Sequence, residues 1–141
     1  PASPPYHLIG AYSAGVADTS SVHVDSGYLT PADIARLVER GAVGDVIGRY
    51  ITADGTIADP ELDARTLGLG LEELRAAGTS ILVIGGEAKH PVARAIVTNR
   101  LCSVLVTDEH TARALLDEQD APSPDLAQTD LATTASREDA S

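Results

Sequence analysis

A glycine pair followed by a lysine is the feature of this sequence whose spacing is best suited to chemistry. Gly85 and Gly86 come directly after a short apolar run, and Lys89 follows three residues later. Glycine lets the backbone turn sharply and approach a ligand closely. A helix that begins there points its free amide hydrogens at the same spot, and a lysine adds a mobile positive charge suited to phosphate. The spacing therefore predicts an anion-binding corner.

Two interpretations of this corner stay open on spacing alone. It is either an anion site or an ordinary turn from strand to helix that carries a surface lysine. Lys89 is the only lysine of the chain, which otherwise uses arginine for positive charge, and this favours a functional role. The run has neither the spacing of a Walker A loop nor the third glycine of the dinucleotide fingerprint.

Two aspartates are further candidates for ligand contact. Asp45 lies in a glycine-rich apolar run, where it is either a surface acid or an acceptor for sugar hydroxyls. Asp108 follows the last apolar run, where it either caps the final helix or faces a ligand. The four histidines show no metal-ligand spacing, and no Ser-His-Asp or Cys-His arrangement is legible. We therefore expect no metal, no cofactor and no catalytic residue.

The elements that must position these residues alternate between strand and helix. The expected strands are 80–84 and 103–106, and the expected helices are 91–98 and 109–116. This βαβα order implies an α/β fold with a parallel sheet and flanking helices. Ligands of such sheets bind beyond the carboxyl ends of the strands, where loops 85–90 and 107–109 lie.

The first part of the chain is expected to add two strands and two helices. We expect a strand within 6–16, a polar loop at 17–30, a helix at 31–40 and a strand at 43–52 that is interrupted by Gly44 and Gly48. A short strand or extended piece at 67–71 and a helix at 71–77 follow. Thr30, Pro31 and Asp33 are typical of a helix start. Asp54-Gly55 is typical of a tight turn.

Composition and charge exclude several classes of protein. The chain has 141 residues, enough for one domain, and its net charge of −11 argues against nucleic-acid binding by these residues. No apolar run is long enough to span a membrane and no signal peptide is present, so we expect a soluble, cytoplasmic protein. The single cysteine, Cys102, is expected to be a buried, inert thiol. Residues 1–5 are expected to be flexible and the acidic residues 117–141 to be disordered, which leaves 6–116 as the folded part.

The order of these motifs resembles the effector-binding domain of SorC-family sugar-sensing transcriptional regulators. The matching runs are 41–50 with Asp54-Gly55, 60–69, 71–74, 85–89, 104–109 and 111–116. The agreement extends over roughly residues 6–116, about the C-terminal half of a family effector domain. The resemblance implies a partial domain with a fold similar to ribose-5-phosphate isomerase and glucosamine-6-phosphate deaminase.

The resemblance also implies a function. It points to a non-enzymatic sensor of a sugar or sugar phosphate, in a homo-oligomer whose DNA-binding domain lies outside this chain. The family's Gly-Gly-x-x-Lys loop at the effector site carries over to Gly85, Gly86 and Lys89, and Asp45 and Asp108 are looser matches. The alternative is a sugar-phosphate isomerase or deaminase of the same fold. That chemistry needs a carboxylate base, and no paired acid and base stands out.

Overall fold

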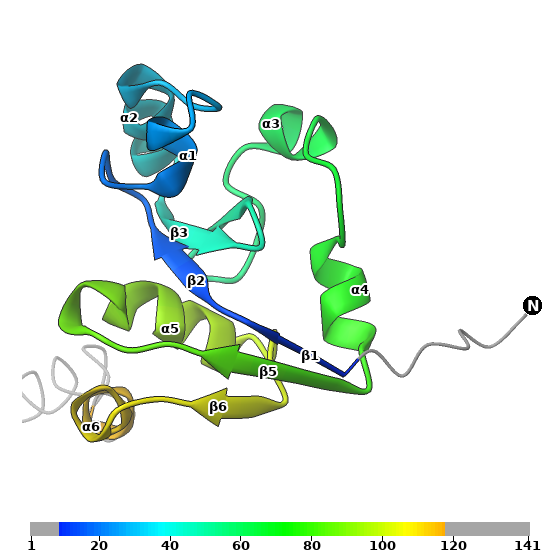
Figure 1. Cartoon of the computed structure of the whole chain (residues 1–141), viewed down its shortest axis with the longest axis vertical. Coiled ribbons are helices and arrows are strands. Elements are labelled where there is room, and N and C mark those ends of the chain that lie inside the picture. The colour runs from blue at the N-terminus through cyan, green and yellow to red at the C-terminus, as the bar shows by residue number, and fades with distance from the viewer. Residues whose placement is uncertain (1–8, 118–141) are drawn as a thin grey trace, which may run out of the picture.

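Two small sheets form the framework of the computed structural model, which describes residues 9–117 (Figure 1). The parallel sheet has the order β1-β5-β6 and the antiparallel sheet the order β2-β3-β4. The strands are β1 (Ile9–Tyr12), β2 (Ala14–Val16), β3 (Ala42–Val46), β4 (Arg49–Thr52), β5 (Thr79–Val83) and β6 (Val104–Val106). The helices are α1 (Val22–Asp25), α2 (Pro31–Glu39), α3 (Pro60–Ala64), α4 (Leu71–Ala76), the 3-10 turn η1 (Glu87–Lys89), α5 (His90–Thr98) and α6 (Glu109–Asp117). The predicted start 1–5 and all of the predicted tail except Asp117 lie outside the described residues.

The β5–α5–β6–α6 unit confirms the predicted parallel sheet. β5 pairs in parallel with β6, with Leu82 opposite Leu105, and on its other side with β1. Helix α5 lies between the two sheets (Figure 1). Its Val92 and Ile96 are fully buried in a core cluster that also contains Leu82 of β5 and Ile51 of β4. The sheets are therefore joined through one buried helix.

The interruptions predicted at Gly44 and Gly48 are confirmed, but residues 43–52 form two strands rather than one: the register shifts at Gly44, and the chain turns at Gly48 into the hairpin β3–β4. Ile47 and Gly48 form the turn, with φ values of 49° and 84°. Hairpin turns of this length favour positive φ at both central residues. A β-branched residue rarely adopts that conformation, so Ile47 gave no sign of a turn in the sequence.

Three other expectations about the first part of the chain also need correction. Residues 6–16 supply two strands in different sheets, because the chain passes from β1 to β2 at Ser13. The polar segment 17–30 contains the short helix α1, which Ser21 caps through its side chain. Residues 67–70 form no strand, which leaves the alternative of an extended piece, and Leu71 begins α4; helix α3 was not predicted.

The predicted start of α2 and the Asp-Gly turn are confirmed. The Thr30 hydroxyl accepts from the amide of Asp33 at 3.2 Å, and the Asp33 carboxylate accepts from the amide of Thr30 at 2.8 Å. The hydrogen bonds that the Thr30 amide and then the Thr30 hydroxyl donate to the carboxylate hold the pKa of Asp33 below its ordinary value. The amide of Gly55 donates to Thr52 O at 2.9 Å and closes the turn after β4.

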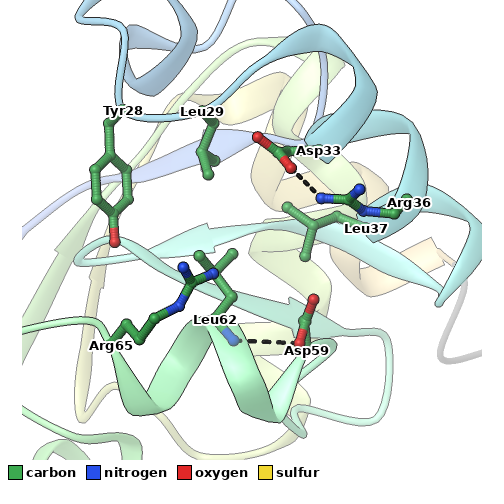
Figure 2. Close-up of a pocket in the computed structure, with 8 residues that line it drawn as sticks. All are labelled: Tyr28, Leu29, Asp33, Arg36, Leu37, Asp59, Leu62 and Arg65. Atoms are coloured by element: carbon green, nitrogen blue, oxygen red, sulfur yellow. Dashed lines mark hydrogen bonds and ion pairs between the residues drawn. The ribbon is translucent and has the colours of Figure 1, made fainter.

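A second, smaller core lies between α2 and the antiparallel sheet. It contains Leu29, Ile34, Leu37 and Tyr50. Beside it, between α2 and α3, lies a cavity of about 350 Å³ (Figure 2). Among residues 9–117, none of the helices has the length and apolar character needed to cross a membrane. Cys102 is half-buried rather than fully buried, and burial raises the pKa of its thiol.

Candidate functional site: the glycine corner

The two predicted ligand loops meet at the carboxyl edge of the parallel sheet. Gly85 and Gly86 follow β5, and Asp108 follows β6, the neighbouring strand. The amide of Ile84 donates to Val106 O at 3.0 Å, so the pairing of the strands continues up to the loops. Gly86 has a φ of 95°, a conformation that favours glycine. The structure therefore brings Gly85, Gly86 and Asp108 together.

Asp108 links the two loops and also caps α6. Its Oδ2 accepts a hydrogen bond from the amide of Gly86 at 3.1 Å, and its Oδ1 accepts one from the amide of Thr111 at 2.7 Å. A Cβ on Gly85 would lie 2.6 Å from Oδ2, so a side chain there would press on the carboxylate. The bonds from the amides of Thr111 and Gly86 hold the pKa of Asp108 below its ordinary value. The predicted role of Asp108 as a helix cap is confirmed, and its contact with a ligand stays a prediction.

Thr111 and His90 extend this contact and were not singled out in the sequence. The Thr111 hydroxyl, fully buried, donates to Asp108 Oδ2 at 3.0 Å. It lies 3.1 Å from His90 Nε2, and since its hydrogen points to Asp108 it accepts from the histidine. The pattern Asp-x-x-Thr is a local signal for the cap. The contact between His90 and Thr111, 21 residues apart, has no local signal.

Lys89 is the available cation of the corner. It is half-buried, and its ammonium has no hydrogen-bond or ion-pair partner within the part of the chain that the structure describes. Its backbone amide donates to Gly86 O at 3.1 Å, which closes η1 and separates the glycines from the first turn of α5. The Oγ1 of nearby Thr107 is buried without a hydrogen-bond partner. The loop after β5 thus holds an ammonium with no partner among the described residues, and the loop after β6 holds the anchored carboxylate of Asp108.

Asp45 lies on β3, and the interpretation as a surface acid is wrong because only 7% of it is exposed. Its Oδ2 accepts from the amide of Gly48 at 3.0 Å and lies 3.4 Å from His23 Nε2. The carboxylate occupies the space that a side chain at Gly15 would fill, 2.2 Å from an added Cβ. Gly15 belongs to β2, and this strand packs against η1. The structure therefore places Asp45 across β2 from the turn that contains Lys89.

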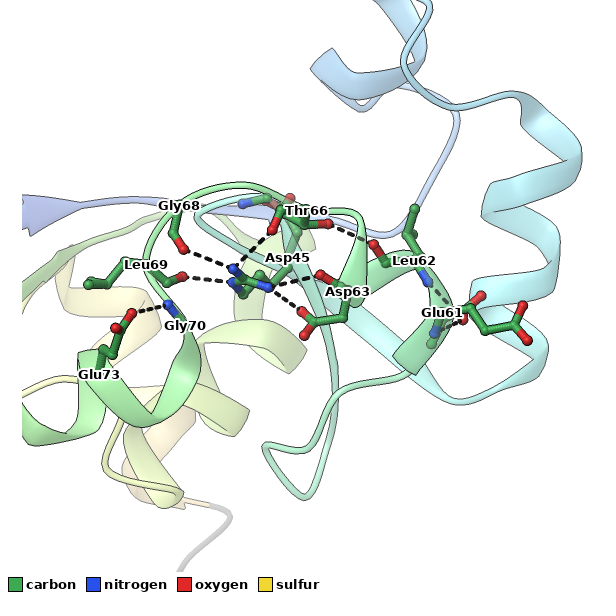
Figure 3. Close-up of polar contacts among 12 residues, drawn as sticks. Asp45, Glu61, Leu62, Asp63, Thr66, Gly68, Leu69, Gly70 and Glu73 are labelled. Atoms are coloured by element: carbon green, nitrogen blue, oxygen red, sulfur yellow. Dashed lines mark hydrogen bonds and ion pairs between the residues drawn. The ribbon is translucent and has the colours of Figure 1, made fainter.

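Arg49 is a structurally important residue that the sequence did not reveal. Its buried guanidinium donates to Leu69 O at 2.7 Å and to Gly68 O at 3.0 Å. It also forms an ion pair with Asp63 at 2.7 Å. Figure 3 shows how the groups of the 63–69 loop turn toward one point. These contacts explain why residues 67–70 form a loop rather than a strand.

Among residues 9–117, no group of three or more histidine, cysteine or acidic side chains is placed to hold a metal ion. The polar groups of the corner are instead suited to hydrogen bonding. Lys89 can donate to an anion or a hydroxyl, and Asp108 can accept from hydroxyls. Asp45 is buried on β3 and is not among the residues that meet at the corner. This combination of donors and acceptors fits a polyhydroxylated ligand.

Comparison with known proteins gives consistent matches. A family model described as "Putative sugar-binding domain" matches residues 9–117. The chain is 34% identical over 110 residues to the deoxyribonucleoside regulator of Bacillus subtilis (strain 168), covering 78% of this chain and 35% of that protein. It is 38% identical over 92 residues to the transcriptional regulator LsrR of Enterobacter sp. (strain 638), covering 64% and 28%. The chain thus spans about a third of the length of these relatives.

Solved structures of regulators share the fold. A transcriptional regulator from Streptococcus pneumoniae TIGR4 superposes with a TM-score of 0.72 at 25% identity, over 80% of this chain and 43% of that one. The full-length sorbitol operon regulator SorC from Klebsiella pneumoniae gives a TM-score of 0.67 at 27% identity, over 77% and 35%. The predicted α/β architecture with a parallel sheet is therefore shared with known regulators.

Proposed function

Because this chain belongs to the sugar-binding domain family of SorC-type transcriptional regulators, we propose that it is part of an effector-binding domain that senses a sugar or sugar phosphate. The observation that carries the proposal is the unpaired ammonium of Lys89 at the carboxyl edge of the parallel sheet. Ligands of α/β sheets bind at this edge. Lys89 binds the phosphate or an equivalent oxygen of the effector.

The other four residues have distinct roles in this proposal. Gly85 leaves room for the Asp108 carboxylate, and the amide of Gly86 orients it. Since that amide already donates to Asp108, Lys89 rather than the glycine turn supplies the attraction for an anion. Asp108 and Asp45 accept hydrogen bonds from sugar hydroxyls.

Binding acts on transcription through parts of the protein outside this chain. An effector that binds one state of an oligomer more tightly than the other shifts the population toward that state. The DNA-binding domain of the protein then changes its affinity for the operator by the same coupling free energy. Sugar effector, homo-oligomer and separate DNA-binding domain are parts of one proposal, and its support is the similarity to whole regulators.

In this proposal the site binds a ligand and does not catalyse a reaction. Catalysis is the alternative, because we expect the fold to resemble two enzymes, ribose-5-phosphate isomerase and glucosamine-6-phosphate deaminase. An isomerase or deaminase needs a base whose pKa lies near the working pH. The hydrogen bonds to Asp108 lower the pKa of its carboxyl group, which makes it a weaker base. The named relatives are regulators as well.

Thermal denaturation with a panel of sugars and sugar phosphates tests the proposal. A ligand that binds the folded state raises the melting temperature, by an amount that grows with its concentration over Kd. We expect one member of the panel to stabilise the protein, and Lys89→Gln to reduce that shift at least by half. Arg75→Gln, which removes an equal charge from α4, is the control and keeps the shift. If Lys89→Gln responds as the unmodified protein does, the assignment of Lys89 is wrong.

A further inference from the structure

The cavity between α2 and α3 is separate from the glycine corner and has its own charged group. Its volume of about 350 Å³ lies within the range of small-molecule sites. Leu29, Leu37 and Leu62 give it apolar walls, and the ring of Tyr28, half exposed, stands at one side. Figure 2 shows the side chain of Arg65 reaching from the end of α3 into the space between the two helices. We call this space the α2–α3 cavity.

The two acids that line the α2–α3 cavity are already engaged. Asp33 accepts from the amide and hydroxyl of Thr30, each at 2.8 Å, and forms an ion pair with Arg36. Asp59 accepts from two amides at the start of α3 and lies 3.3 Å from Arg40. Neither carboxylate is therefore left to bind a cation.

Arg65 is the remaining charged residue of the cavity lining. Its guanidinium makes no hydrogen bond or ion pair within residues 9–117. The charged residues that line the cavity are two acids, Asp33 and Asp59, and two arginines, Arg36 and Arg65. The charge of Arg65 also helps to lower the pKa of Asp33, after the hydrogen bonds from Thr30 and the charge of Arg36. An unpaired guanidinium over apolar walls stands out in a chain whose net charge is −11.

We propose that the α2–α3 cavity binds a small monocarboxylate with an apolar or aromatic body. The planar guanidinium of Arg65 matches a carboxylate through two parallel N–H donors. The body of the ligand packs against the Tyr28 ring and the leucines. A monocarboxylate brings one negative charge close to Asp33 and Asp59, whereas a phosphate dianion would bring two.

A neighbouring cavity gives such a ligand room to extend. It has a volume of about 410 Å³ and shares Tyr28 and Arg65 with the α2–α3 cavity. Its further walls include His23 and Leu67, and Leu67 is 95% exposed. Tyr28 and Arg65 thus border both spaces, so a body longer than one ring can continue past them while its carboxylate stays at Arg65.

Titrations with benzoate test the proposal, because benzoate is a planar monocarboxylate of suitable size. Binding is followed by chemical-shift changes of backbone amides in a ¹⁵N-labelled protein. We expect saturable shifts centred on Leu37 and Arg65, with benzamide, the neutral analogue, binding at least tenfold more weakly. Arg65→Gln is expected to weaken benzoate at least tenfold, and Arg75→Gln, an equal change on α4, to leave it unchanged. The Arg65 guanidinium has no partner within the described residues, so the variant should keep the parent spectrum elsewhere.

Three results would overturn the proposal. They are the absence of saturable shifts at these amides, an unchanged affinity in Arg65→Gln, and inorganic phosphate binding as tightly as benzoate. Tyr28→Leu is a second variant that keeps apolar area but removes the ring, and we expect it to weaken benzoate severalfold. The site does not depend on the sugar site, because Arg65→Gln should leave any sugar response of Lys89 intact.

Discussion

The carboxylate of Asp108 accepts a hydrogen bond from the amide of Gly86 at 3.1 Å, across 22 residues of chain. The contact ties the loop after β5 to the loop after β6, at the edge where an α/β sheet binds its ligand. It also means that one backbone donor of the glycine turn is already satisfied within the protein. The selectivity of the corner for an anion therefore depends on Lys89.

Replacing Asp108 separates its two structural roles. Asp108→Ala removes both the cap of α6 and the bond to Gly86, so we expect a lower free energy of unfolding. Asp108→Asn keeps an oxygen that can cap the helix, and asparagine is as good a cap as aspartate. We therefore expect it to be clearly less destabilising than Asp108→Ala in urea denaturation. Equal losses in both variants would show that the charge, rather than the cap, is what matters.

Stability is expected to fall in acid because of Asp33 and Asp108. The pKa of each is lower in the folded protein than its ordinary value, so in the interval between the two values the unfolded chain binds more protons. Their contribution is therefore complete above about pH 5 and is lost as the pH falls below about 4. The melting temperature measured from pH 6 to pH 2.5 should decline over this window. Asp108→Asn should flatten the decline, and an unchanged slope would contradict the assignment.

Gly85→Ala tests the close approach of the two loops. The added Cβ would lie 2.6 Å from Asp108 Oδ2, so the carboxylate must move and its bond to Gly86 should break. We expect a destabilisation of about 1–2 kcal/mol, as for other overpacked sites. Gly10→Ala is the control, because an added Cβ there meets nothing within 4 Å. Unfolding in urea measures both.

A double-mutant cycle of Gly85→Ala and Asp108→Ala tests whether the cost at position 85 comes from the contact with Asp108. In the Asp108→Ala background the new methyl group at position 85 no longer meets a carboxylate, so the cost of Gly85→Ala should fall to nearly zero. A cost that stays the same in both backgrounds would show that the backbone of the turn, not the contact with Asp108, requires glycine.

The features of the corner that were predictable are those with local signals. The apolar run before Gly85 and the cap Asp108 are set by neighbours within a few residues, so both strands and the following helices could be placed. The bond between Gly86 and Asp108 joins two loops through the register of the sheet, and spacing in the sequence does not show register. Asp45 was named from the sequence as a candidate for ligand contact. Its burial could not be predicted, because it depends on Gly15, which lies on another strand.

The features that were missed oppose local preference or depend on distant partners. Ile47 adopts a φ of 49° in the β3–β4 turn, against the preference of a β-branched residue. The bond from the amide of Gly48 to Asp45 stabilises that turn. In the sequence this bond corresponds to an aspartate three residues before a glycine. That spacing is too common to predict a turn. Arg49 looked like an ordinary strand residue because its acceptors lie 14–20 residues further along the chain.

Arg49→Met is expected to be the most destabilising of these substitutions. Methionine fills a similar volume, but the carbonyls of Gly68 and Leu69 lose their donor and Asp63 loses its ion pair. Breaking a buried pair of this kind costs about 3 kcal/mol, less where water reaches the acceptors. Arg75→Met on exposed α4 is the matched control and should cost under about 1 kcal/mol. Amide hydrogen exchange should rise first in the 63–70 loop, because Arg49 holds the carbonyls of this loop. Unchanged protection of these amides would show that the loop is held by other contacts.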